Sequence, residues 1–94
     1  MSTTALSPQK SLGLRIKELR YAQTMTQEEL AERAEVFRTY MSRVESGLAN
    51  PTLTVLHKFA SALNVNICEL FVEPVTRVPK VKSKDTISRG RVKS

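Results

Sequence analysis

The sequence predicts an all-α fold: one compact domain of five short helices, followed by a flexible, basic C-terminal tail. Apolar residues recur at intervals of three and four along most of the first 73 residues, which is the spacing of one helical face. Helix-capping residues precede these segments, and no segment has the alternation of a convincing β-strand. The whole excess of positive charge follows the last periodic segment.

The first helix is predicted over residues 8–23. Ser7 supplies a cap and Pro8 a first-turn proline, an order typical of helix N-termini. Three apolar residues then share one face, because they are spaced by four and three positions: Leu12, Ile16 and Leu19.

The second helix, predicted over residues 27–34, begins with a capping box. In T-Q-E-E-L-A the Thr26 hydroxyl can accept from the backbone N–H of Glu29, and the Glu29 carboxylate can accept from that of Thr26. Leu30 and Ala31 are expected to face inward. A helix of about two turns is too short to be stable alone, so it must pack against neighbours.

The third helix is predicted over residues 38–46. Met41 and Val44 are three positions apart and are expected to be buried, and Gly47 is expected to end the helix. Four polar or basic residues share another face: Arg38, Thr39, Ser42 and Arg43.

A turn at residues 50–52 leads from the third helix to a threonine cap and a fourth helix. Five residues of that helix are expected to face the core: Leu53, Leu56, Phe59, Ala60 and Leu63. Asn64 ends it. Asn66 then caps a fifth short helix over residues 67–71, and Pro74 closes the folded part.

Charge divides the chain unevenly. Residues 1–73 carry eight Lys/Arg and eight Asp/Glu, whereas residues 74–94 carry seven Lys/Arg and one Asp. We therefore predict an N-terminal extension over residues 1–11, a folded domain over residues 12–73 and a basic, mobile tail over residues 74–94.

Several classes of function are disfavoured. A single cysteine, Cys68, forms no intrachain disulfide, and without a Cys/His cluster no metal and no cofactor is expected. One histidine, no glycine-rich phosphate loop and no paired catalytic carboxylates argue against an enzyme. No apolar run approaches the roughly 18 to 20 residues of a membrane span, and the N-terminus lacks a signal-peptide pattern. A cytoplasmic protein without a membrane partner is expected.

Two short helices joined by a turn of about three or four residues form the helix-turn-helix unit, whose second helix enters the DNA major groove. The segment around the second and third helices resembles the core of the lambda-repressor-like, Cro/C1-type regulators, also called the xenobiotic-response-element family: T-Q-E-E-L-A-E-R-A-E-V-F-R-T-Y-M-S-R-V-E-S-G-L-A-N-P-T-L. The resemblance extends from about Leu12 to Phe71. Within it, R-T-Y-M-S-R-V-E-S-G is most similar to restriction-modification controller proteins and to small phage- or plasmid-type regulators.

The resemblance implies a role for individual positions. Three match residues that contact base edges: Arg38, Thr39 and Arg43. Four match residues that contact the phosphodiester backbone: Gln27, Tyr40, Ser42 and Asn50. Two match a partly buried salt bridge between the first and third helices: Arg20 and Glu45. An Arg guanidinium can pair with guanine O6 and N7, whereas phosphate contacts set only the register.

The chain departs from the family pattern at three places. Glu35 stands where the family usually has a glycine with positive φ. A glutamate in this left-handed conformation is expected to cost about 1 kcal/mol of stability. Phe37 stands where a small capping residue is usual and is expected to lie against a thymine methyl or a sugar, or to cover the turn. Leu48 and Ala49 occupy a loop that is often rich in Lys and Arg in the family, so this loop is expected to attract DNA phosphates less than in relatives. The basic tail is expected to compensate.

Together these features predict a sequence-specific transcriptional regulator that binds a palindromic double-stranded DNA operator as a homodimer. Three apolar residues of the fifth helix are expected at the dimer interface: Ile67, Leu70 and Phe71. The alternative is an antitoxin-type interaction protein, in which the tail docks a toxin as its protein partner while the domain binds DNA. RNA binding is disfavoured because aromatic residues that could stack on bases are few.

Overall fold

A computed structural model describes residues 6–75 of the chain. The predicted N-terminal extension lies partly outside this range, and the predicted tail lies almost wholly outside it. The mobility of the tail and the division at residues 11 and 73 therefore stay predictions. Helix formation begins at Pro8, inside the predicted extension.

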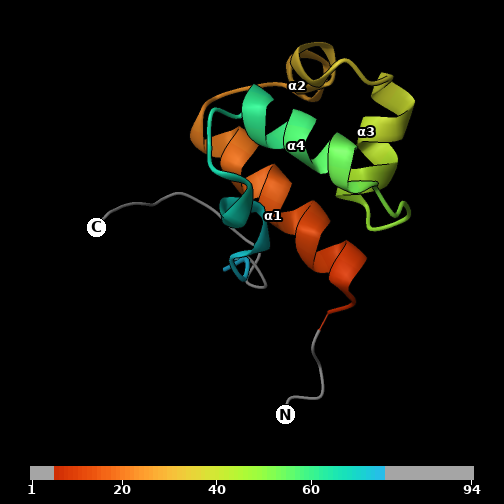
Figure 1. Cartoon of the computed structure of the whole chain (residues 1–94), viewed down its shortest axis with the longest axis vertical. Coiled ribbons are helices and arrows are strands. Elements are labelled where there is room, and N and C mark those ends of the chain that lie inside the picture. The colour runs from red at the N-terminus through yellow and green to blue at the C-terminus, as the bar shows by residue number, and fades with distance from the viewer. Residues whose placement is uncertain (1–5, 76–94) are drawn as a thin grey trace.

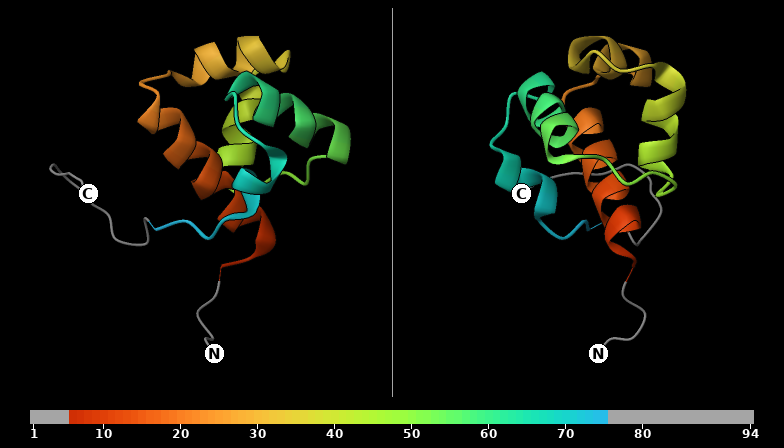
Figure 2. Two further views of the ribbon diagram at one scale, coloured as in Figure 1. Left: turned by 60° about the vertical axis from the view of Figure 1, so that its left-hand side comes forward. Right: turned by 45° about the vertical axis from the view of Figure 1, so that its right-hand side comes forward.

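Four α-helices and one 3-10 helix make up the fold, and no strand occurs among residues 6–75 (Figure 1). Their bounds are α1 Pro8–Ala22, α2 Gln27–Ala34, α3 Arg38–Glu45, α4 Leu53–Ala62 and η1 Ile67–Phe71. The all-α prediction is confirmed, and the fifth helix is of the tighter 3-10 type. α1 packs against α3 and η1, while α4 packs against α2 and η1. This arrangement leaves α3 at one edge of the molecule (right panel of Figure 2).

The predicted caps are present at four helix starts, and at η1 Asn66 Oδ1 accepts from the backbone N–H of Cys68 at 3.0 Å. Ser7 Oγ accepts from the backbone N–H of Lys10 at 3.1 Å, and Thr52 Oγ1 accepts from that of Val55 at 3.2 Å. Both bonds of the capping box at α2 form, at 3.0 and 2.8 Å. Each cap pairs a backbone donor that the first turn of a helix leaves without an intrahelical partner.

Left-handed backbone conformations end the helices. Glu35 has φ 62°, which confirms the positive φ that the resemblance to the family implied for this residue. Gly47 has φ 77° and follows α3, and Asn64 has φ 58° and follows α4. Thr24, after α1, has φ 54°, although a β-branched side chain is poorly suited to this region.

The core lies where the four α-helices and η1 meet. Its largest fully buried side chains are Phe59, Ile16, Leu30, Met41, Leu63, Leu70 and Val44. The expectation that Leu53 faces this core is wrong, since its side chain is 65% exposed. Leu53 forms the first position of α4, and the residues of that helix that are buried lie in its later turns.

A cluster that the sequence did not predict holds the end of the described chain against α1. Arg15 donates to Glu18 Oε1 at 3.1 Å, to the Glu69 backbone oxygen at 2.7 Å and to Glu69 Oε1 at 2.8 Å. Glu18 Oε2 in turn accepts from the backbone N–H of Val75 at 2.6 Å, and Pro74 is buried. We call Arg15, Glu18 and Glu69 the C-terminal clamp, because they hold the chain where the basic tail begins.

Candidate DNA-binding surface

The turn between α2 and α3 is built by residues 35–37. Glu35 takes the left-handed conformation, and the backbone N–H of Val36 donates to the Ala31 oxygen at 3.0 Å, so the chain folds back on the end of α2. Val36 packs against the core, while Phe37 takes the N-cap position of α3 and its side chain is 85% exposed. Phe37 makes no capping hydrogen bond, so it does not replace the small capping residue that is usual at this position.

α3 has one buried and one exposed face. Met41, Val44 and Glu45 are buried, and Tyr40 is half-buried against the core. The opposite face exposes four side chains together, as the helical spacing predicted: Arg38, Thr39, Ser42 and Arg43. This face can therefore enter a groove without disturbing the core.

The two arginines of this face have partners within the chain. Arg38 Nε lies 3.7 Å from Glu28 Oε2, and both side chains are largely exposed. Arg43 Nη2 donates to the Leu48 backbone oxygen at 2.9 Å. Exposed ion pairs of this kind contribute about 0 to 1 kcal/mol, so Arg38 can exchange Glu28 for another acceptor at small cost.

A buried network joins α1, α2 and α3 behind this face. Arg20 Nε donates to Glu45 Oε2 at 2.7 Å, and Arg20 Nη2 donates to Glu45 Oε1 at 2.9 Å. Arg20 Nη1 donates to the Met25 backbone oxygen at 3.0 Å. The hydrogen bonds that Arg20 donates to Glu45 raise the pKa of the Arg20 guanidinium against the opposing effect of burial, so the guanidinium stays charged. The predicted salt bridge between the first and third helices is thus present.

Gln27 belongs to the same network, which the sequence did not predict. Its Nε2 donates to Glu45 Oε1 at 3.1 Å, and its side chain is half-buried at the start of α2.

The loop between α3 and α4 exposes both Leu48 and Asn50. Residues 46–52 contain no Lys or Arg, so this loop attracts phosphates only through polar groups.

The residues predicted for a dimer interface divide into two kinds. Leu70 is fully buried, so its assignment to an interface is wrong: it is a core residue that joins η1 to α1 and α4. Phe71 is 62% exposed, and Ile67 is half-buried. Adjacent residues of a 3-10 helix point about 120° apart, so Leu70 and Phe71 face different surroundings.

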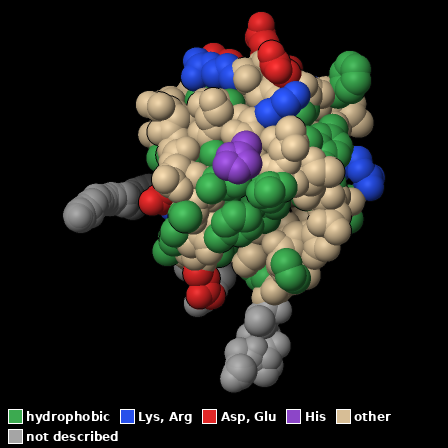
Figure 3. All heavy atoms as spheres, viewed as in Figure 1, with side chains coloured by type: hydrophobic (Ala, Val, Ile, Leu, Met, Phe, Trp, Pro, Cys, Tyr) green, Lys and Arg blue, Asp and Glu red, His purple; other side chains and the backbone are tan. Residues whose placement is uncertain are grey.

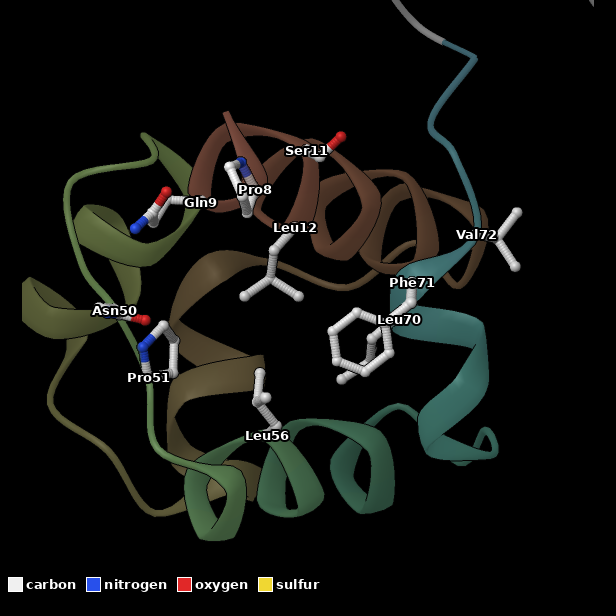
Figure 4. Close-up of a pocket in the computed structure, with 10 residues that line it drawn as sticks. All are labelled: Pro8, Gln9, Ser11, Leu12, Asn50, Pro51, Leu56, Leu70, Phe71 and Val72. Carbon is white, nitrogen blue, oxygen red and sulfur yellow. The ribbon is translucent and has the colours of Figure 1, made fainter. Parts of the chain in front are cut away.

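Phe71 borders a groove of about 250 Å³ between α1, the Pro51 loop, α4 and η1 (Figure 4). Its apolar lining includes Leu12, Pro51, Leu56, Leu70, Phe71 and Val72. Hydrophobic side chains gather below the single histidine on the face where α4 and η1 lie (Figure 3). Val72 and Leu6 add exposed apolar surface.

Residues 6–75 hold no group of three His, Cys, Asp or Glu side chains arranged to bind a metal ion. In the same part of the chain, no helix has the length and apolarity needed to cross a membrane.

Comparisons with known proteins agree with this geometry. A sequence model described as "Helix-turn-helix" matches residues 16–70, more than half of the chain. The immunity repressor protein of Bacillus phage phi105 is 35% identical over 63 residues, which are 67% of this chain and 44% of the repressor. The chain therefore spans less than half the length of that relative.

Two solved structures extend the likeness to three dimensions. The restriction-modification controller protein C.AhdI from Aeromonas hydrophila is 39% identical, with a TM-score of 0.65 over 66% of this chain and 94% of that one. C.Esp1396I, another controller protein, was solved as a tetramer with its natural 35 base-pair operator. It is 30% identical, with a TM-score of 0.65 over 71% of this chain and 88% of that one.

Proposed function

The chain belongs to the helix-turn-helix family of DNA-binding transcriptional regulators, and we propose that it binds a palindromic operator as a symmetric dimer. In this proposal α3 of each copy enters the major groove of one half-site. The observation that carries it is the division of α3 into a buried apolar face and an exposed face with two arginines and two hydroxyl groups. The protein acts in the cytoplasm, where it associates with the nucleoid when it is bound to DNA.

Base recognition is assigned to Arg38, Thr39 and Arg43. Each arginine can present two parallel N–H groups to guanine O6 and N7, and Thr39 can present a methyl group to thymine. The exposure of all three side chains on one face of α3 supports the assignment. The ion pair of Arg38 with Glu28 is weak enough to be exchanged for a base.

Backbone contacts are assigned to residues around this face: Gln27, Tyr40, Ser42 and Asn50. Gln27 begins α2, where the positive end of the helix dipole also favours a phosphate. Phe37 projects from the start of α3 and is proposed to lie against a thymine methyl or a sugar. Contacts of this class fix the register of α3 on the duplex.

Dimerisation is assigned to the surface around Ile67 and Phe71. One module of this size covers only a few base pairs, so useful affinity requires two half-sites, about 34 Å apart. Exposed apolar surface beside a groove supports the assignment, as does the assembly of the similar C.Esp1396I on its operator. No contact of the described residues favours the antitoxin interpretation.

The experiment that tests the base-reading assignment compares operator and random DNA. The operator is first located as the DNA segment that the protein protects upstream of its own gene. Arg38→Ala and Arg43→Ala should each weaken operator binding by about 1 to 3 kcal/mol and random-DNA binding much less. Arg33→Ala, which removes an exposed arginine from α2, is the matched control and should leave the ratio unchanged. Equal losses on both DNAs for Arg38 and Arg43 would refute the assignment.

A further inference from the structure

The Glu45 side chain connects the interior of the domain to the DNA-binding surface. It is 1% exposed, and its two oxygens accept three hydrogen bonds, two from Arg20 and one from Gln27. A salt bridge that served only to join α1 to α3 would need the first two. The third bond runs to a residue of a different helix, which stands at the edge of the proposed DNA contact.

We propose that Glu45 is a positioning residue that fixes the side-chain amide of Gln27 for its contact with a DNA phosphate. The inference rests on the proposed function, because it gives a cause for the backbone contact assigned to Gln27. Glu45 itself touches no DNA in this proposal. It acts through the orientation of the Gln27 amide, and Arg20 acts through Glu45.

The orientation follows from hydrogen-bond chemistry. An ionised carboxylate can only accept, so Glu45 Oε1 requires the NH₂ group of Gln27 and excludes its carbonyl oxygen. One N–H of Gln27 then points inward to Glu45, at 3.1 Å, and the second N–H is directed elsewhere. A phosphate oxygen at the start of α2 is an acceptor of the kind that this second N–H needs. The amide would therefore bridge two anions, one buried and one on the DNA.

Arg20 makes this bridge compatible with DNA. A buried carboxylate without a counter-charge would repel a nearby phosphate and would be costly to keep ionised. The bidentate bonds from Arg20, at 2.7 and 2.9 Å, neutralise Glu45 and leave one of its lone pairs for Gln27. The bond from Arg20 to the Met25 oxygen also fixes the loop that leads into α2.

Preorganisation is the expected benefit. A free glutamine side chain loses rotamer freedom when it binds a phosphate, and a glutamine already held by Glu45 loses less. The effect should strengthen binding to every DNA sequence alike, since the phosphate carries no base information. The ratio of operator to random-DNA affinity should therefore not depend on Glu45.

A double-mutant cycle tests the proposal with Gln27→Ala, Glu45→Gln and the double variant. Gln27→Ala should weaken binding to operator and random DNA by a similar factor, about tenfold. Glu45→Gln should weaken both by several-fold, because an amide at position 45 offers one acceptor oxygen where the carboxylate offers two, so the three hydrogen bonds from Arg20 and Gln27 cannot all form. In the double variant the two losses should not multiply: its affinity should match that of Gln27→Ala. Glu32→Gln, on the exposed face of α2, removes one negative charge without touching the network and serves as the matched control.

The outcomes separate the proposal from the function on which it rests. Losses that multiply in the double variant would overturn the positioning role and leave the phosphate contact of Gln27 intact. No loss for Gln27→Ala would remove that contact from the proposed function, and the positioning role with it. Circular dichroism at the assay temperature confirms that each variant is folded.

A second measurement covers the case in which Glu45→Gln does not fold. In the free, unaltered protein, NMR relaxation of the Gln27 Nε2 group should give an order parameter near the value of about 0.85 found for rigid backbone. The Gln9 side chain, half-buried near the start of α1, provides the comparison. An order parameter below about 0.6 for Gln27 would show that Glu45 does not hold it and would overturn the proposal.

Discussion

Gly13 of α1 lies so close to Val44 of α3 that a Cβ atom on the glycine would stand 2.5 Å from the Val44 backbone oxygen. The Glu45 backbone oxygen would be 2.6 Å away. Both oxygens belong to the last turn of α3, so the backbone of α1 directly supports the helix proposed to enter the major groove. Only a residue without a side chain permits this approach.

Gly13→Ala should therefore lower the free energy of unfolding by about 1 to 3 kcal/mol, because the added methyl group meets backbone atoms that cannot move aside. The loss should appear even though alanine is a better helix former than glycine by about 1 kcal/mol. Urea denaturation followed by circular dichroism measures it. Lys17→Ala, on the same helix, should stay within about 0.5 kcal/mol of the unaltered protein. A Gly13→Ala variant as stable as the parent would contradict the close approach.

Glu35→Gly should stabilise the domain by about 1 kcal/mol, because glycine takes the left-handed conformation of this residue without strain. The loss of the exposed Lys58–Glu35 pair, at 3.7 Å, offsets little of this gain. Glu32→Gly is the matched control. It places glycine inside α2 and should destabilise by about 1 kcal/mol. Thermal unfolding midpoints that fall for both variants would show that residue 35 is not strained.

Phe71→Ser should give a folded monomer that binds the full operator little better than a single half-site, because Phe71 is exposed on the proposed interface. Leu70→Ser should instead unfold the domain, since Leu70 is fully buried. Sedimentation velocity at tens of micromolar and circular dichroism distinguish the two results. Tyr21→Ser, which removes a comparably exposed aromatic ring from α1, should leave the dimer intact. A dimeric Phe71→Ser variant would exclude this surface as the interface.

Truncation after Val75 should keep the domain folded, because the C-terminal clamp and the buried Pro74 are retained. The deletion removes all seven basic residues that give the chain its excess charge. Each phosphate neutralised adds about 0.9 to the slope of log affinity against log salt, so the slope should flatten by about two to four units. A full-length variant with these seven residues changed to Gln should behave like the truncated chain. An unchanged slope in both would leave the tail without a DNA role.

Local features of the fold could be predicted from the sequence because they depend on neighbouring residues alone. The caps at Ser7, Thr26 and Thr52 each join a hydroxyl to a backbone N–H three residues later. The exposed face of α3 follows from helical spacing in the same way. The left-handed conformation of Glu35 was expected from the resemblance to a family that has glycine there.

Other features depend on how the helices pack, which spacing does not determine. Leu70 and Phe71 are both apolar, and in a helix as short as η1 the pattern does not tell which of them faces the core. The bond between Gln27 and Glu45 depends on the placement of α2 against α3, and the clamp joins residues 54 positions apart. Gly13 did carry a signal, since a glycine inside a helix lowers stability and usually has a packing reason.

The Leu48 backbone oxygen gives the Arg43 guanidinium a hydrogen-bond acceptor within the chain when no DNA is bound. In the proposed complex, Arg43 reads one base of the operator. Where an operator has a different base at this position, the guanidinium can keep its bond to the Leu48 oxygen and so still has an acceptor. The mismatch then forfeits a contact without incurring the larger penalty of an unpaired charged donor. Operators that vary at this base are accordingly expected to be occupied to graded extents, so that neighbouring half-sites of unequal sequence fill in order as the concentration of the regulator rises.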